Sequence, residues 1–549
     1  MDDMMMISLY DWFSQWISDI YKIPLSGTPE EVLKKIGAPK RLFSWCEEIE
    51  NNSYPLKDFG EWPLPDLQRR ERGKKRRIGQ YYTPENLVKK LYDVTGISLI
   101  GSTILDPACG DGAFLIPAAM ISAKSSTDAP LENLWGFDLD SEALLVCLAR
   151  LLKCAPRGGW PNLQKRDFLL TPTDPIFDLV LGNPPYRVNL DLKLREILQD
   201  KYETAEGEKD LYTFFLEGGI KALVPGGQLI MLTSHTFLVN QQCNKIRRFL
   251  FEKNSPHNLF ILPHGFFKSA LGVIPVVLHV ENSLSRGKPL VVHNQFDEQT
   301  GWKIKTTADP DFFLKPTGMR RALTDPKLTE VFQKMEADSL QLGEIAKIGV
   351  GIQESLTRGS KISRFVAESK KSSSHVRVVR GREIRPFRIS WEGKFLHYGP
   401  HLTYAGDPKI FRKDKILYQN IRNESLPLRL VAALDTEGFF PKNSLSFITN
   451  PEPPYSLLFI VGLLNSPLIN AWFQGNFYSF HITVSQVRKI PIPRGDEHKI
   501  RTVENIVNKI ISCEIHSRDM LEELAVAVAE CFFPAHDVPE IMNLCRQFS

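Results

Sequence analysis

Three absences limit what this sequence can be. None of its eight cysteines forms a CxxC pair, which argues against the commonest zinc and dithiol motifs. The first residues, MDDMMMISLY, are acidic where a secretion signal would be basic. Apolar runs such as residues 458–464 are too short to cross a bilayer. We therefore expect a cytoplasmic protein with reduced, mostly buried thiols, no metal and no membrane partner.

The sequence also has no evident internal repeat and no long low-complexity segment, so its 549 residues predict two or three globular domains. Its net charge of +4 hides an uneven distribution. Residues 347–434 contain 18 Lys and Arg residues against 7 Asp and Glu residues, a surplus of 11 positive charges. Such a surplus favours a polyanionic partner. The alternative is a solvated loop region.

The spacing of apolar residues divides the chain into four predicted segments. Residues 1–75 have apolar side chains at helical intervals and end in a basic stretch, which is either a solvated linker or a phosphate contact. Residues 76–285 alternate apolar runs with helical stretches, which predicts a doubly wound α/β domain with a parallel sheet. Residues 286–497 have the short strands and turns of an irregular α+β domain, and residues 498–549 are predicted to be a helical tail.

Three acidic residues follow apolar runs of the predicted sheet, where ligands bind in doubly wound folds. Asp106 precedes a Gly-rich turn, Asp138 ends the run LWGFD, and Asp167 precedes the aromatic Phe168. Their carboxylates can accept hydrogen bonds from a ligand amine or from ribose hydroxyls, and an acid beside a ring suits an adenine. The alternative role is a helix cap, which Asp140 fits better because a helix is expected to begin directly after it.

The most specific motif is NPPY, residues 183–186, directly after the apolar run FDLVLG. Its prolines fix the backbone, so the Asn183 amide and the Pro184 carbonyl are held beside the Tyr186 ring. Two fixed acceptors can draw an aryl amine toward tetrahedral geometry and free its lone pair to attack, without invoking a metal or a general base. The alternative is a simple turn, which the Gly-rich loop upstream makes less attractive.

Taken in order, the segments YYTP, DPACGDGAF, GFDLD, RDF, NPPY and FFKSALGVIPVV resemble the TaqI-like and Eco57I-like N6-adenine DNA methyltransferases of type II restriction-modification systems. The resemblance is strong over residues 76–285 and looser over residues 341–493, which look like the target-recognition region of that family. It implies a Rossmann-like class I methyltransferase domain, S-adenosylmethionine as cofactor and double-stranded DNA as substrate. A separately encoded cognate restriction endonuclease would be a functional partner.

The same resemblance implies roles for individual residues. The residues that would hold the methionine part of the cofactor are Thr83, Asp106, Ala108, Cys109 and Gly110. Asp138 would bind the ribose, while Asp167 and Phe168 would hold the cofactor adenine. The target base would contact Asn183, Pro184 and Tyr186, with Phe267 or its neighbour Phe266 packing against it. The loop departs from the family pattern by carrying Asp111 after its first glycine.

The surplus of basic residues adds Arg380, Arg382 and Arg385 as predicted DNA contacts.

Alternative classes of protein explain less of the sequence. A glutamine or RNA methyltransferase can carry NPPY, but the basic region would then have no task. A DNA-binding regulator with a vestigial methylase fold would be expected to have a broken NPPY or Gly-rich loop, and both are intact. A fused nuclease is not expected, because residues 1–75 contain no convincing metal-binding cluster. The sequence thus predicts an adenine-N6 DNA methyltransferase that flips its target base.

Overall fold

The computed structural model describes residues 5–56, 83–125, 129–171, 173–174, 176–186, 192–206, 210–263, 266–267, 274–284, 288–316, 326–354, 365–422, 428–477, 481–513 and 517–548. The chain divides into two compact units, Met1–Ala322 and Leu323–Ser549. The basic stretch at residues 69–77, with its two open interpretations, lies outside the described residues.

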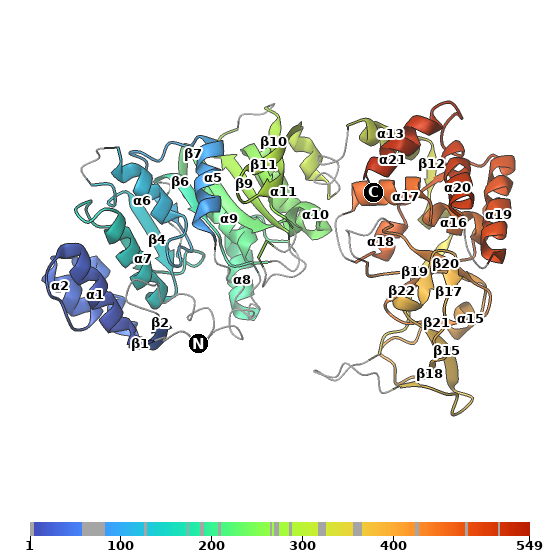
Figure 1. The fold of residues 1–549 in the computed structure, drawn as a ribbon, viewed down its shortest axis with the longest axis horizontal. Helices are drawn as coiled ribbons and strands as arrows, with labels where there is room; N and C mark the ends of the chain where they lie inside the picture. Colours follow the sequence, from blue (N-terminus) through green and yellow to red (C-terminus); the bar gives the residue numbers. More distant parts are fainter. Residues whose placement is uncertain are drawn as a thin grey trace. The chain divides into compact units, whose positions relative to one another are not determined.

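A small helical layer opens the first unit. Strands β1 (Met5–Ser8) and β2 (Ser53–Leu56) pair antiparallel, and helices α1 (Leu9–Tyr21) and α2 (Pro29–Lys35) lie between them in the sequence. Helix α1 begins at the Ser8 cap and buries Trp12, Trp16 and Ile17, as its apolar spacing predicts. It packs against helix α7 (Ser141–Cys154), so the amino-terminal helices belong to the same unit as the sheet (Figure 1).

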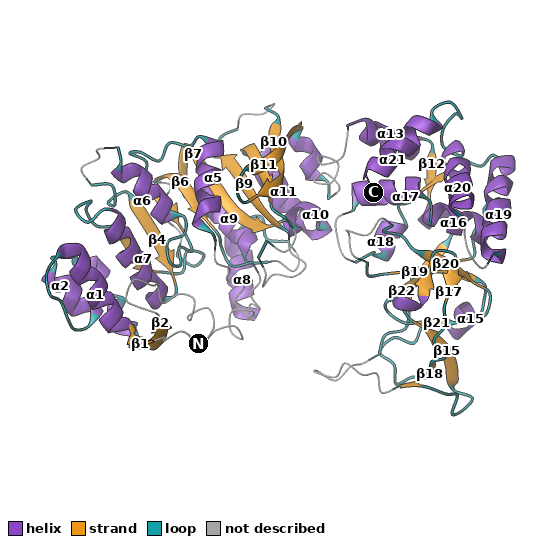
Figure 2. Cartoon of the chain, in the orientation of Figure 1, coloured by secondary structure: helices purple, strands orange, loops and turns teal. Residues whose placement is uncertain are grey.

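Within the described residues, a nine-stranded sheet with the order β11-β10-β8-β9-β7-β6-β3-β4-β5 forms the centre of the first unit. Figure 2 shows strands of this sheet in orange, with helices in purple beside them. The first seven strands of the sheet along the chain are β3 (Ile104–Asp106), β4 (Leu134–Asp138), β5 (Asn162–Lys165), β6 (Phe177–Gly182), β7 (Leu223–Ser234), β8 (Ser255–Ile261) and β9 (Pro275–Glu281). Strands β3 to β7 are mutually parallel, but β9 runs antiparallel to both β7 and β8. The sheet is therefore mixed rather than parallel as predicted, because an apolar run shows that a strand is buried and not which way it runs.

The helices around this sheet begin and end where local capping rules place them. Helix α5 (Glu85–Thr95) begins directly after Pro84 and ends at Gly96 in the left-handed conformation. The Asp140 side chain accepts hydrogen bonds from two backbone amides at the start of α7, which confirms it as a cap. The remaining helices are α6 (Leu115–Ala123), α8 (Leu192–Lys201), α9 (Tyr212–Lys221), α10 (Thr236–Val239) and α11 (Asn244–Glu252). This alternation of strands and helices confirms the doubly wound α/β class.

Two strands beyond residue 285 complete the sheet. Strand β10 (Leu290–Asp297) runs parallel to β8, and β11 (Gly301–Ala308) pairs antiparallel with β10. The turn between them contacts α5, where Asn86 Nδ2 donates to the Glu298 carbonyl (3.2 Å) and Lys90 Nζ donates to the Gln299 carbonyl (2.7 Å). The compact unit thus continues past the boundary predicted at residue 285, because these strands pair with the sheet edge.

The second unit has two apolar cores on opposite faces of one sheet. In the described residues this sheet has the order β13-β22-β19-β20, with strands β13 (Lys347–Val350), β19 (Lys415–Gln419), β20 (Ala432–Asp435) and β22 (Leu445–Thr449). Ile416 and Ile448 belong to one core, while their neighbours Leu417 and Phe447 belong to the other. This alternation is the two-residue period of a strand that is buried on both faces.

Helices build the first of these cores, and short strands build the second. The main helices are α13 (Pro326–Ala337), α16 (Leu457–Leu464), α17 (Pro467–Asn476), α19 (Glu497–Ser512), α20 (Arg518–Glu530) and α21 (Val538–Phe548). The short strands are β14 (Val366–Ala367), β15 (His375–Val379), β16 (Ile384–Arg385), β17 (Arg388–Ile389), β18 (Phe395–His397) and β21 (Phe440–Pro441). Smaller elements are β12 (Ser339–Gln341), α14 (Leu342–Ile345), α15 (Pro408–Phe411), α18 (Val484–Val487) and β23 (Pro491–Pro493). The predicted helical tail is confirmed, and it packs into the first core instead of standing alone.

All eight cysteines are free, and five of them are buried. In the part of the chain that the structure describes, no single helix combines the length and the apolar character needed to span a bilayer. Helices α16 and α17 would reach that length only as a pair bent by 64°. Both helices are largely buried in the first core of the second unit.

Candidate active site

The carboxyl ends of four neighbouring strands carry most of the predicted site residues. Strands β5, β4, β3 and β6 are adjacent and parallel, so the residues that end or follow them share one edge of the sheet. Asp106 and Asp138 are the last residues of β3 and β4, and Asn183 follows β6 directly. This edge is where ligands bind in doubly wound folds.

Asp106 lies at the centre of this edge and is 1% exposed. Its Oδ1 atom accepts a hydrogen bond from the Ala108 amide (3.1 Å). Burial raises the pKa of Asp106 well above its ordinary value. A Cβ atom placed on Gly182 would lie 2.7 Å from Asp106 Oδ1, a distance that a real side chain does not tolerate. The glycine before Asn183 therefore lets β6 approach Asp106 closely.

The loop after β3 is fastened to β4 by its backbone. The Gly110 amide donates to Asp138 Oδ2 (2.8 Å), and the Asp140 amide donates to Oδ1 of the same carboxylate (2.9 Å). The Cys109 amide donates to the Phe137 carbonyl (2.9 Å). Burial raises the pKa of Asp138 to about 6. Gly110 has a positive φ of 51°, and the position of a Cβ atom there is open space.

Asp111, the residue that departs from the family pattern, has a partner of its own. Arg150 Nη1 donates to the Asp111 carbonyl oxygen (2.8 Å) and also forms an ion pair with its carboxylate. The other terminal nitrogen of Arg150 pairs with Glu85, the first residue of α5. Burial raises the pKa of Asp111, and the Arg150 charge opposes that rise. The loop is thus tied to α7 and α5 at once.

Asn183 and Thr83 are in direct contact. Asn183 Nδ2 donates to Thr83 Oγ1 (2.9 Å), and Thr83 is 2% exposed just before α5. Because the amide nitrogen is held by this hydroxyl, the orientation of the whole Asn183 amide is set. Pro184 is buried beside it. The structure thus places Thr83, predicted for the cofactor, against the residue predicted for the target base.

The aromatic residues predicted to hold the target base are buried. Tyr186 is 1% exposed and meets Tyr212 edge-on, with ring centroids 6.2 Å apart. Phe267 is 7% exposed and meets Phe266 edge-on, with ring centroids 5.2 Å apart. Phe266 contacts Phe296 of β10 in the same manner, at 5.8 Å. A base that stacks on Tyr186 must therefore first uncover its ring, and the stacking roles stay predictions.

Asp167 and Phe168 have structural contacts that the sequence did not reveal. Asp167 Oδ1 accepts hydrogen bonds from the amides of Leu169 (2.9 Å) and Leu170 (3.2 Å), the pattern of a turn cap. The Phe168 ring is 2% exposed and stacks on Phe215 of α9, with centroids 5.8 Å apart. Both residues support the fold at this edge, and contact with the cofactor adenine stays a prediction.

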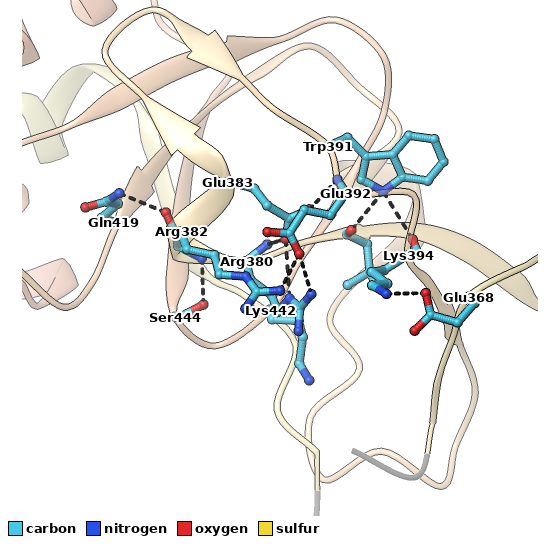
Figure 3. A network of polar contacts seen from close by, with 12 residues as sticks. Glu368, Arg380, Arg382, Glu383, Trp391, Glu392, Lys394, Gln419, Lys442 and Ser444 are labelled. Atoms are coloured by element: carbon cyan, nitrogen blue, oxygen red, sulfur yellow. Dashed lines mark hydrogen bonds and ion pairs between the residues drawn. The ribbon is translucent and has the colours of Figure 1, made fainter. Parts of the chain in front are cut away.

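The arginines predicted to contact DNA lie in the second unit. Arg380 directly precedes a short 3-10 turn, Gly381–Glu383, and Arg382 lies within that turn. Both arginines form ion pairs with Glu392 (Figure 3). Arg385 is exposed at the end of β16. Two of the three predicted contacts are thus already engaged by a carboxylate within the chain.

Two residues at this edge were missed from the sequence. Arg150 is a lone basic side chain inside the apolar stretch LLVCLARLL, and a buried charge of that kind signals a specific partner. Gly182 ends a strand directly before NPPY, where a glycine suggests close backbone approach. Among the described residues, no group of three or more His, Cys, Asp or Glu side chains is arranged to hold a metal ion.

Two family profiles match the chain. The Eco57I restriction-modification methylase family matches residues 160–267, which include NPPY and Phe267. The TaqI-like C-terminal specificity domain matches residues 376–492, which include the three arginines. Each match lies within one of the two compact units.

Curated relatives and solved structures agree with these profiles. The type II methyltransferase M.TthHB8I of Thermus thermophilus is 24% identical over 438 residues, which are 76% of this chain and 92% of that protein. M.BanIII of Aneurinibacillus aneurinilyticus is 31% identical over 201 residues, 33% of this chain and 34% of that protein. The type IIL restriction-modification enzyme MmeI, solved in complex with DNA, has a TM-score of 0.56 at 11% identity, with 88% of this chain and 76% of that chain covered. At this identity the likeness to MmeI shows a shared fold.

Proposed function

We propose that this chain is a type II restriction-modification methyltransferase that methylates N6 of adenine at a specific site in duplex DNA. S-adenosylmethionine is the methyl donor of this family. The NPPY geometry favours a planar aryl amine as the acceptor, and adenine N6 is such an amine. A cognate endonuclease, encoded separately, would then cleave the same sequence when it is unmethylated.

The loop after β3 fits S-adenosylmethionine. Gly110 leaves open space where a Cβ atom would stand, so a ligand can approach its backbone closely. Both Asp138 oxygens accept backbone amides, and the carboxylate, with about four lone-pair sites, can also accept a ribose hydroxyl. Asp106 offers a buried carboxylate to an ammonium group, whose charge would offset the desolvation that raises its pKa. When bound, the cofactor supplies an electrophilic methyl group on a sulfonium.

The observation that carries the proposal is the close approach of Gly182 to Asp106. It supports a site in which the amine-binding motif begins directly beside the cofactor loop, as direct methyl transfer requires. Thr83 holds the nitrogen of the Asn183 amide, so the amide oxygen is the atom offered to a target amine. Together with the Pro184 carbonyl it provides two acceptors for the two N–H donors of N6. Holding both donors favours the tetrahedral nitrogen that attacks the methyl group.

The burial of this site supports base flipping as part of the proposal. N6 of a paired adenine is engaged in Watson–Crick bonding, and Tyr186 is 1% exposed in the free chain. The target base must therefore leave the helix, at a cost of a few kcal/mol. Stacking on an aromatic ring contributes about 1–3 kcal/mol per base, which can offset much of that cost. Tyr186 is the ring that NPPY supplies, and Phe267 would pack from another side.

Sequence recognition is assigned to the second unit. Its match to a specificity domain and the surplus of 11 positive charges over residues 347–434 support contacts with phosphates and base edges. Arg380, Arg382 and Arg385 are the proposed phosphate contacts.

The test is to incubate the purified chain with S-adenosylmethionine and unmethylated DNA and to identify the product nucleoside by mass spectrometry. We expect N6-methyladenine, and single-molecule sequencing of DNA from cells that express the chain should give its sequence context. N4-methylcytosine as the only product would refute the assignment to adenine, while methyl transfer to DNA would still stand.

The role of Asn183 is tested by Asn183→Ala. Removal of one preorganised polar partner commonly lowers the rate of the chemical step about 10²- to 10³-fold. Cofactor affinity should stay close to that of the wild type, because the proposed ligand contact of Asn183 is with the target amine and not with the cofactor. Turnover at the wild-type rate would contradict the proposed mechanism.

A further inference from the structure

Arg380 and Arg382 converge on a single carboxylate oxygen. Arg380 Nη2 lies 3.1 Å from Glu392 Oε2, and Arg382 Nη2 pairs with the same oxygen atom. Figure 3 shows the two guanidinium groups pointing toward Glu392 from the turn that follows β15. Two planar donors within reach of one acceptor are the arrangement that binds carboxylate or phosphate groups.

The buried residue Glu383 holds Arg380 and Glu392 in this arrangement. Glu383 has a fully buried side chain, and its Oε2 atom accepts the Arg380 amide (2.9 Å) and Arg380 Nε (3.3 Å). Its Oε1 atom accepts the Glu392 amide (2.9 Å). One buried carboxylate therefore holds the backbones of Arg380 and Glu392 in place.

The turn that carries the arginines is held from its other side as well. The Gly381 amide donates to Ser444 Oγ (2.9 Å), and Gln419 Nε2 donates to the Gly381 carbonyl (2.8 Å). The side chains that meet above it are accessible, since Arg382 is 62% and Glu392 is 37% exposed. The backbone of the turn is thus fixed, while the Glu392 carboxylate can be replaced by another anion.

We propose that Arg380 and Arg382 form one anion-binding site, which Glu392 fills in the free chain and a backbone phosphate of duplex DNA fills in the complex. The inference rests on the proposed function in one respect, that this unit binds DNA. Glu392 then acts as an intramolecular competitor and lowers the affinity for every duplex, whatever its sequence. It also keeps the two guanidinium groups together, ready for the phosphate.

The electrostatics of the pair fit such an exchange. Hydrogen bonding to Arg382 holds the pKa of Glu392 below its ordinary value, so the competitor is ionised at neutral pH. Exposed ion pairs of this kind are weak and screened by salt. DNA presents phosphates at high local density and releases counterions when they are contacted. A phosphate can therefore displace Glu392, whereas free anions at low concentration do not.

The experiment measures binding of the full chain to a fluorescein-labelled 30-base-pair duplex of arbitrary sequence by anisotropy, between 50 and 200 mM salt. Glu392→Gln should raise the affinity about 2- to 10-fold, as expected from the loss of weak exposed ion pairs. Replacing both Arg380 and Arg382 with Gln should lower it and reduce the salt slope by about 0.9, the value for one phosphate. Arg382→Gln alone serves as a second variant, because its exposed side chain pairs with Glu392, whereas the buried Glu383 pairs with Arg380.

Glu540→Gln is the matched control, since it removes one negative charge from an exposed ion pair with Lys327 on the same unit. We expect its affinity to equal that of the wild type. In the background of both arginine substitutions, Glu392→Gln should have no further effect. An equal gain in affinity in that background would show a general charge effect. Wild-type affinity for Glu392→Gln alone would overturn the proposed exchange.

Unchanged DNA binding after replacement of both arginines would show that they do not form a phosphate-binding site. Absence of N6-methyladenine would instead refute the proposed function and leave these binding results intact.

Discussion

The pKa of Asp138 predicts how cofactor affinity depends on pH. Asp138 is 9% exposed, and burial raises its pKa from 3.8 to about 6. In the proposed complex, a ribose hydroxyl would donate to the ionised carboxylate and gain much less from the protonated form. S-adenosylmethionine should therefore bind with constant affinity above about pH 7, and the affinity should fall as the pH decreases through 6. One protonation with this pKa weakens binding about tenfold between pH 7.5 and pH 5.

Folding stability should change in the opposite direction. Because the folded pKa of Asp138 lies above the unfolded value, the folded chain binds this proton more tightly. The contribution of Asp138 to stability therefore falls as the pH rises from about 4 to about 6, and it is constant above that window. A shift of about 2 pKa units corresponds to roughly 3 kcal/mol. Protonation of Asp138 at low pH thus stabilises the folded chain. Unfolding caused by this protonation therefore does not explain a loss of cofactor affinity at low pH.

Calorimetric titration with S-adenosylmethionine at pH 5 to 8 tests this, with Asp138→Asn as the control. The variant cannot ionise, so its affinity should be about 10- to 100-fold lower at pH 8, as for loss of a charged hydrogen bond. The part of the pH profile due to Asp138 should vanish in the variant, while any part due to the buried Asp106 should persist. If wild type and variant had parallel profiles, Asp138 would not be the group that binds the ribose.

Three further predictions concern other parts of the chain. Tyr186→Ala should capture the extruded base poorly, whereas Tyr186→Phe should retain it because stacking uses the ring face; 2-aminopurine fluorescence at the target position compares them. Equal brightening by both variants would remove the stacking role. Arg150→Met should lower the free energy of unfolding by about 3–5 kcal/mol, because Asp111 stays buried without its partner. Denaturant unfolding measures this loss, and adding Asp111→Asn should recover part of it. DNA affinity should fall about 10³-fold or more between 50 and 200 mM salt if six or more phosphates are engaged, and a flat response would favour the solvated-loop interpretation of residues 347–434.

Local features of this fold could be predicted from the sequence. The apolar runs became strands β4, β6, β7, β8 and β9, and the helix cap at Asp140 was found because it depends on residues close together in the chain. The strand ends that carry Asp106, Asp138 and Asn183 followed from the same alternation. The two family profiles agree with the family that these motifs indicated.

Features that depend on distant pairing could not be predicted. The direction of β9 and the addition of β10 and β11 are set by neighbours far away in the sequence. The stacking of Phe168 on Phe215 likewise depends on α9, which lies far away in the sequence. The pairing of Arg380 and Arg382 with Glu392 requires the chain to turn back through β16 and β17. A count of charged residues therefore predicts the sign of the net charge of a surface. It does not show which basic side chains already form ion pairs within the chain.

The hairpin of β10 and β11 determines where this chain can be cut and joined. A fragment ending at residue 285 would lose both strands and leave β8 as a bare edge, a template for aggregation. It would also lose the Glu298 and Gln299 carbonyls that fasten α5, the helix that follows Thr83. A chimera that borrows the recognition unit of a relative should therefore keep the hairpin with the catalytic half, with the junction between Ala322 and Leu323.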